Sequence, residues 1–179
     1  MTPSALLHAA ESVRWVERPA NAVARAIRRR ISGTRLDRVL GGSWLGHPTH
    51  PLLVTVPIGA LVCAPVLELG VGQPRAARCL TTIGLLAVPP AVAAGLADFA
   101  HLDDVQRRVG ALHAAANVLS AAFFAASLRY PPGARATLVC SALGTLTIAV
   151  GGALGGHLSY AQGAGVYRWQ RPEERDDWT

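Results

Sequence analysis

Six histidines are the residues of this chain best suited to carry chemistry, and five of them lie at the ends of long uncharged stretches. A neutral imidazole is a ligand for haem iron and for Zn, Cu or Fe, while a carboxylate suits the harder ions. A compact metal site would draw its ligands, and an acidic ligand or orienting group, from His47, His50, His113, His157 and Asp98.

A haem site is the second candidate, and it needs two imidazoles that face each other at equal depth. His113 lies early in one uncharged stretch and His157 near the end of the next. The run GGALGG just before His157 removes side chains, so the edge of haem b could lie against bare backbone. Close helix packing is the other explanation of these glycines. The haem hypothesis names His113, His157, Gly152 and Gly156 as cofactor-binding residues.

The same pattern also has a purely structural explanation, in which each imidazole caps a helix end or lies at headgroup level. His101 stands in a polar loop and His8 in the N-terminal segment, and both are expected at the surface. A non-catalytic structural or assembly subunit is therefore the alternative function. The chain shows no hydrolytic nucleophile with its base, no phosphate loop and no acid pair, so enzyme status stays open.

The stretches that position these residues are those of a polytopic membrane protein. Hydrophobic residues make up 51% of the 179 and charged residues 16%, against about 25% charged in soluble domains. Crossing a hydrocarbon core of about 30 Å takes about 20 apolar residues. Four stretches meet this requirement and are joined by short connectors. We expect an all-α, up-down bundle of four transmembrane helices, with spans at about 52–71, 79–97, 109–128 and 136–158.

The arginines predict the orientation of this bundle. Four spans put both termini on one side of the membrane, together with the loop after the second span. That side carries thirteen of the 17 basic residues and the other side four. By the positive-inside rule both termini are cytoplasmic, in the plasma (inner) membrane. Because the spans alternate in direction, the five span-end histidines and Asp98 converge at this cytoplasmic interface.

The segments outside the bundle are polar. Residues 1–45 form a basic amphipathic segment with a break at Pro19, which suits a headgroup plane or a partner, or serves as a topology signal. Its apolar residues alternate with Arg, unlike a signal peptide, and it lacks the stacking aromatics of a nucleic-acid surface. Residues 46–167 are the transmembrane domain and residues 168–179 a polar tail.

Prolines and cysteines inside the spans are best explained by packing. Pro57 and Pro65 in the first span and the pair Pro89–Pro90 in the second are expected to kink their helices. The midplane carries no charge, which argues against a proton or ion transporter. A bridge between Cys79 and Cys140 fits the topology, but buried free thiols are favoured for Cys63, Cys79 and Cys140.

Four motifs in a fixed order carry a family resemblance: GHPTHPLLVTVPIG at 46–59, GLAD at 95–98, RRVGALHAAAN at 107–117 and GGHLSYAQGAGV at 155–166. Over roughly residues 40–167 the chain resembles the uncharacterised four-span bacterial membrane family called domain of unknown function 2231. In that family such modules are sometimes joined to a Rieske iron–sulfur domain, which implies a redox setting. The chain lacks Rieske Cys/His pairs, so an iron–sulfur or other redox partner would be a separate protein. An electron-transfer subunit is the function we expect.

Overall fold

A computed structural model describes residues 3–165, and across these residues every regular element is a helix. The four long apolar segments are Thr49–Leu69, Pro74–Phe99, Asp104–Ser127 and Arg135–Ala161, of 21 to 27 residues each. At a rise of 1.5 Å per residue each is about 30–40 Å long, enough to cross the hydrocarbon core. The prediction of an all-α protein with four membrane-spanning helices is confirmed.

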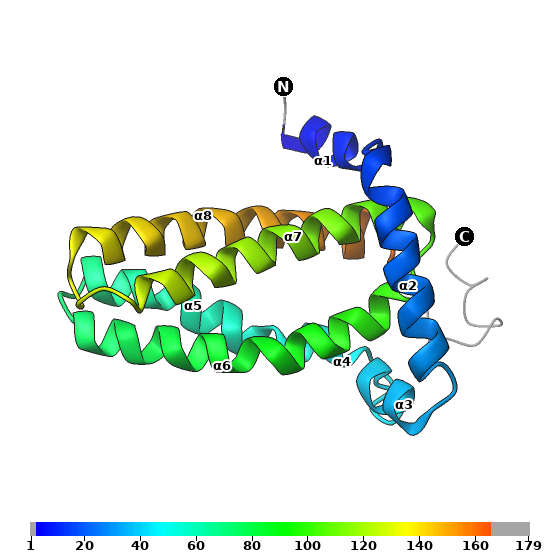
Figure 1. Ribbon diagram of the computed structural model, residues 1–179, viewed down its shortest axis with the longest axis horizontal. Helices are drawn as coiled ribbons and strands as arrows, with labels where there is room; N and C mark the ends of the chain where they lie inside the picture. Colours follow the sequence, from blue (N-terminus) through cyan, green and yellow to red (C-terminus); the bar gives the residue numbers. More distant parts are fainter. Residues whose placement is uncertain (1–2, 166–179) are drawn as a thin grey trace.

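The bundle consists of two helical hairpins. In one, α5 (Thr55–Leu69) packs along α6 (Pro74–Phe99); in the other, α7 (Asp104–Ser127) packs along α8 (Arg135–Gly156). Figure 1 shows the two hairpins lying one above the other with their axes along the long dimension of the molecule. Arg78 of α6 donates hydrogen bonds of 2.5 Å and 2.9 Å to the carbonyls of Leu128 and Tyr130, so it ties the hairpins together at their looped end.

Small residues let the paired helices approach closely. A Cβ on Gly84 would lie 2.8 Å from Leu61, and one on Gly144 would lie 2.7 Å from Phe124. Ser120 closes the same contact with a hydrogen bond of 2.8 Å to the carbonyl of Gly144. Packing of small residues is the usual basis of helix association in lipid, where burial of apolar surface supplies no driving force.

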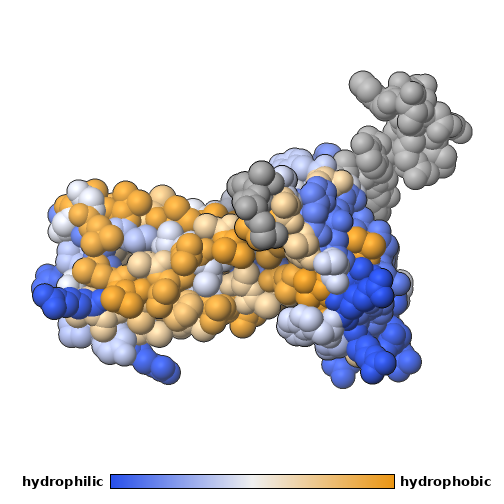
Figure 2. All heavy atoms as spheres, turned by 90° about the horizontal axis from the view of Figure 1, so that it is seen from above, coloured by the Kyte–Doolittle hydropathy of each residue, from blue (hydrophilic) through white to orange (hydrophobic). Residues whose placement is uncertain are grey.

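Large apolar side chains point outward along the shaft of the bundle, and polar ones gather at its ends, as Figure 2 shows. Leu86 is 73% exposed and Leu146 63%, which would be costly in water and suits a lipid surround. Cys63, Cys79 and Cys140 are free thiols.

The first span is interrupted near its start, because Pro57 lacks the N–H that would bond the carbonyl of Leu53. α4 (Thr49–Leu53) ends there, and α5 begins at Thr55. The second span behaves differently, since α6 continues through Pro89 and Pro90 as one helix.

The N-terminal segment caps one end of the bundle with α1 (Pro3–Glu11), the short 3₁₀ helix η1 (Arg14–Val16), α2 (Glu17–Ile31) and α3 (Arg35–Gly41). Figure 1 shows α2 crossing the ends of the long helices. The predicted break at Pro19 is wrong. The chain turns at Ser12 and Val13, and Pro19 stands in the first turn of α2, where the missing N–H costs nothing.

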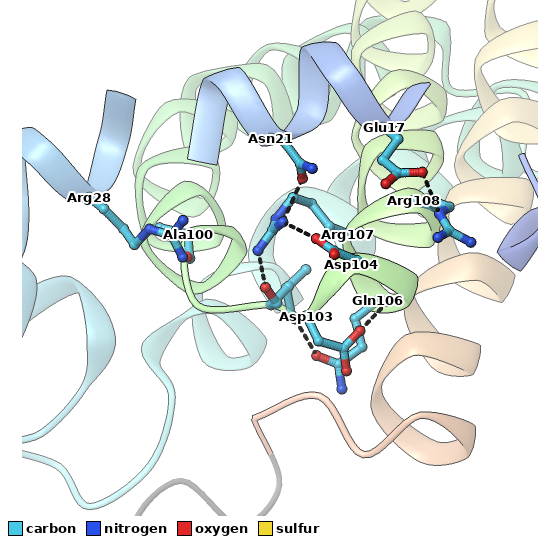
Figure 3. A network of polar contacts seen from close by, with 10 residues as sticks. Glu17, Asn21, Arg28, Ala100, Asp103, Asp104, Gln106, Arg107 and Arg108 are labelled. Atoms are coloured by element: carbon cyan, nitrogen blue, oxygen red, sulfur yellow. Dashed lines mark hydrogen bonds and ion pairs between the residues drawn. The ribbon is translucent and has the colours of Figure 1, made fainter. Parts of the chain in front are cut away.

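A buried arginine fastens this cap to the loop between α6 and α7 (Figure 3). Arg107 is 7% exposed and donates hydrogen bonds to Asn21 of α2 at 2.5 Å, to Asp104 at 2.8 Å and to the carbonyl of Leu102. Arg28 of α2 donates to the carbonyl of Ala100 at 3.1 Å. The N-terminal segment is therefore packed against the bundle end through specific contacts.

Candidate metal centre

Two of the predicted ligands, His50 and His113, face each other at the capped end of the bundle. Their ring centroids lie 6.5 Å apart and the ring planes are nearly perpendicular, at 86°. His50 comes from the first hairpin, at the second residue of α4, and His113 from α7 in the second hairpin. Each hairpin therefore contributes one imidazole.

The loop before α4 places His50. Gly42 ends α3 with φ +83°, and a Cβ there would lie 1.9 Å from the carbonyl oxygen of His47, so only glycine lets the chain fold back this tightly. Thr49 then donates its hydroxyl to the carbonyl of Leu40 and fixes the start of α4.

The His50 ring lies flat against α6. A Cβ on Gly95 would come within 2.8 Å of its Cε1, so the glycine makes room for the ring. Its Nδ1 lies 2.9 Å from the carbonyl oxygen of Ala91. A carbonyl only accepts hydrogen bonds, so Nδ1 carries the proton and Nε2 keeps its lone pair.

His113 has the same arrangement on α8. A Cβ on Gly155 would lie 2.9 Å from its Cε1, and its Nδ1 donates to the carbonyl of Gly151 at 2.8 Å. The Nε2 lone pair is again left unprotonated. Asn117, one turn further along α7, donates to the carbonyl of His113 at 2.9 Å, and its amide nitrogen lies 3.2 Å from Nε2 and 3.3 Å from Nδ1 of the ring.

This tautomer is the one that metal-binding histidines adopt, with Nδ1–H held by a backbone carbonyl and Nε2 available as ligand. Two imidazoles that share one ion in a straight line, with metal–nitrogen bonds of about 2.0–2.1 Å, place their ring centroids about 6–6.5 Å apart. The spacing of His50 and His113 matches that value. The pair is therefore the candidate site for a single ion between the hairpins.

The structure does not bring His157 to this pair. His157 follows Gly155 by two residues, which is about 200° around a helix, so it projects from the opposite side of α8. Its Nε2 lies 2.7 Å from a carboxylate oxygen of Glu11, and its ring lies 5.1 Å from that of His8. The bis-imidazole haem predicted for His113 and His157 thus lacks the facing pair that it requires.

The other predicted residues differ in their exposure. His47 is exposed in the loop before α4, and Asp98 is half-buried in α6. His101 is exposed and donates to the carbonyl of Ala97 at 2.9 Å, in keeping with the surface position expected for it. Gly152 and Gly156 face away from the neighbouring helices, because a Cβ on either would meet no atom within 4 Å.

Sequence reasoning missed two kinds of residue. Gly151 and Gly155, which the side chains of Asn117 and His113 contact, lie one position before the predicted Gly152 and Gly156, and Gly95 contacts His50. Glu11 and His8 were missed as partners of His157. The only signal for them was the spacing of three residues between His8 and Glu11, which puts both on one face of a helix.

Hydrogen bonds from the neighbouring side chains set the electrostatics of the Glu11 cluster. The hydrogen bond from His157 lowers the pKa of the Glu11 carboxyl below its ordinary value, and the contact with His8 acts in the same direction. The carboxylate form is therefore favoured, with both imidazoles directed at it.

Taken together, the fold and these contacts define a helical membrane protein of four spans with histidines gathered at one end of the bundle. The model of the family described as Predicted membrane protein (DUF2231) matches residues 46–168, and the chain belongs to this family. The match begins just before His47 and covers all four spans. Searches of the curated proteins and of the solved structures gave no significant match.

Proposed function

We propose that this membrane protein binds one transition-metal ion between His50 and His113 and transfers electrons through it. The observation that carries the proposal is the facing pair of imidazoles, each with Nδ1–H fixed on a backbone carbonyl and Nε2 left as a lone pair. Imidazole suits Cu, Fe and Zn. Since both ligands are neutral, an ion of low charge is least costly in a bundle surrounded by lipid, and copper cycling through Cu⁺ is the first ion to test.

The asymmetry of the arginines favours placing this site on the cytoplasmic side, with the N-terminal helices in the cytoplasm. A separate redox protein, such as an iron–sulfur protein, would then approach the capped end of the bundle. The amide nitrogen of Asn117 lies 3.3 Å from Nδ1 and 3.2 Å from Nε2 of His113, so it stands over the ring and not in line with the Nε2 lone pair.

The alternative function is a structural or assembly subunit. It is favoured by the same hydrogen bonds, since each imidazole fastens two helices together without any ion.

The two functions are separated by metal analysis of the full-length protein purified in detergent after expression with added copper, iron or zinc. We expect about one ion per chain at the His50–His113 site. His50→Ala and His113→Ala should each remove it, whereas His47→Ala, an exposed position three residues from His50, should keep it. If the parent protein shows a Soret band and the same two variants lose it, the bound group is haem instead of an ion.

Folding has to be controlled in this experiment, because both rings fill space between helices. His113→Asn keeps an N–H near the position of Nδ1 but has no atom at the position of Nε2. This variant should retain the helical circular dichroism and melting temperature of the parent while losing the ion. A metal content that is the same in the parent, His50→Ala and His113→Ala, or a parent that binds no metal when loaded, would leave the structural function in place of ours.

A further inference from the structure

A second cluster of metal ligands lies where the N-terminal helix meets the end of α8. Nε2 of His157 lies 2.7 Å and Nδ1 of His8 lies 3.3 Å from the same oxygen, Oε1 of Glu11. The two imidazole rings are 5.1 Å apart at 87°. One ligand atom from each of the three residues can be chosen so that all lie within 4.8 Å of one another. These separations are close to those between ligands that share one transition-metal ion.

One side of the cluster is buried in the protein, and the other side is exposed. The side chain of His157 is 5% exposed, that of Glu11 29% and that of His8 65%. Two histidines and one carboxylate form the ligand set of catalytic zinc sites and of non-haem iron sites, in which the remaining positions are open to water. The exposed side at His8 provides such positions.

Contacts outside the three ligands hold both sides of the cluster, and the side chain of Gln162 also hydrogen-bonds the Glu11 carboxylate. Arg108 of α7 donates to the main-chain carbonyl of Glu11 at 2.8 Å and lies 3.4 Å from Glu17 (Figure 3), which fixes the end of α1. On the other side, Gln106 donates to the main-chain carbonyl of Gln162 at 3.0 Å, which holds the turn after His157.

His157 also begins a π-helical turn, His157–Ala161, whose wider ring is closed by a hydrogen bond of 3.1 Å from the N–H of Gln162 to the carbonyl of His157. Single π turns are uncommon and occur frequently at functional sites. The turn coincides with the one residue of the cluster that belongs to a membrane-spanning segment.

We infer that His8, Glu11 and His157 form a second metal site, which takes a divalent first-row ion such as Zn²⁺ or Fe²⁺. The ion binds Nδ1 of His8, a carboxylate oxygen of Glu11 and Nε2 of His157, with water at the open positions. Each imidazole then carries its proton on its other ring nitrogen, so the ion replaces two hydrogen bonds to Glu11. Bound metal fastens α1 to α8. This site goes beyond the proposed function and does not depend on it.

The test uses the full chain in detergent, with His50→Ala and His113→Ala both present so that the first site is removed. Zn²⁺ is titrated by calorimetry, and Co²⁺ is used as an absorbing substitute. We expect one Zn²⁺ per chain, with Co²⁺ bands showing nitrogen and oxygen ligands. Glu11→Gln and His8→Ala should each weaken Zn²⁺ binding by more than about tenfold. Both positions are on the N-terminal helix, so the membrane domain stays folded.

The matched control is Glu17→Gln, since Glu17 is also an acid of the N-terminal segment and contacts Arg108 instead of a histidine. Its Zn²⁺ affinity should equal that of the parent. The inference is overturned if Glu11→Gln and His8→Ala bind Zn²⁺ as tightly as Glu17→Gln, or if the parent binds no Zn²⁺. Either result would show that the cluster is only hydrogen-bonded. If the protein with both His50→Ala and His113→Ala unfolds, the same variants are compared in the parent chain. There the number of bound ions should fall from two to one in Glu11→Gln and His8→Ala. The proposed function fails separately, when the parent chain and the His50 and His113 variants hold the same number of ions.

Discussion

The close contact of His113 with its supporting helix leads to a quantitative prediction for Gly155→Ala. The new Cβ would lie 2.9 Å from Cε1 and 3.0 Å from Nδ1 of His113, so the ring has to move away from α8. Movement gives up the hydrogen bond to Gly151, which is worth about 0.5–1.5 kcal/mol, and overpacking costs about 1–3 kcal/mol. Alanine recovers about 0.5–1 kcal/mol as a better helix former. The net loss of stability is about 2 kcal/mol.

Thermal unfolding in detergent, followed by circular dichroism at a fixed heating rate, measures this loss. For a chain of this size about 2 kcal/mol lowers the melting temperature by about 4–8 °C. Gly156→Ala is the matched control, because its Cβ meets no atom within 4 Å, and it should melt at the parent temperature or slightly above. If Gly155→Ala melted as high as Gly156→Ala, His113 would not be held against α8, and the tautomer argument would lose its support.

Three further predictions concern the capped end of the bundle and its orientation. Arg107→Ala leaves the carbonyl of Leu102 and the amide oxygen of Asn21 without their donor. It should lower the stability by about 1–3 kcal/mol, measured as faster hydrogen exchange in α2. The control Arg29→Ala, at an exposed position, should change the stability by less than about 0.5 kcal/mol. Because the pKa of Glu11 is lowered in the folded protein, its carboxylate form stabilises the docked N-terminal helix. This stabilisation is complete above the ordinary carboxyl pKa and is lost as the pH falls through the lowered value. Exchange in α1 should therefore rise in acid, and an acid step that persists in Glu11→Gln would contradict the assignment. Reporter domains inserted after residue 75 should lie outside and after residue 104 inside the cell, with the reverse pattern excluding a cytoplasmic site.

The four spans could be predicted from the sequence because lipid imposes a simple rule. Every backbone group in the membrane must be bonded internally, so uncharged stretches of sufficient length become helices. The observed ends of the four spans differ from the predicted ends by a few residues in most cases. The first helical segment starts at Thr49, before the predicted 52, since Thr49 bonds back to α3 and polar residues extend the helix past the apolar core.

The pairing of the histidines could be predicted only in part. Alternation of the spans brings five of them to one end, but which two rings face each other depends on how far each helix is rotated about its axis. An error of one residue turns a side chain by 100°, which separates Gly152 and Gly156, on the outer surface, from Gly151 and Gly155 at the interface. The contact between Glu11 and His157 joins residues far apart in the sequence through packing of the N-terminal helix, and helical periodicity holds no information about it.

Each hairpin holds its histidine by the same pair of contacts, and this geometry supports the proposed metal site. In each hairpin the acceptor carbonyl lies four residues before the glycine, Ala91 before Gly95 and Gly151 before Gly155, so both stand on one face of the helix. A ring laid over the glycine therefore reaches that carbonyl directly. Asparagine could donate the same hydrogen bond, and for helix association alone it would suffice. Only an imidazole joins that donor rigidly to a lone pair on its other side, and two such lone pairs, one from each hairpin, are what a shared ion requires.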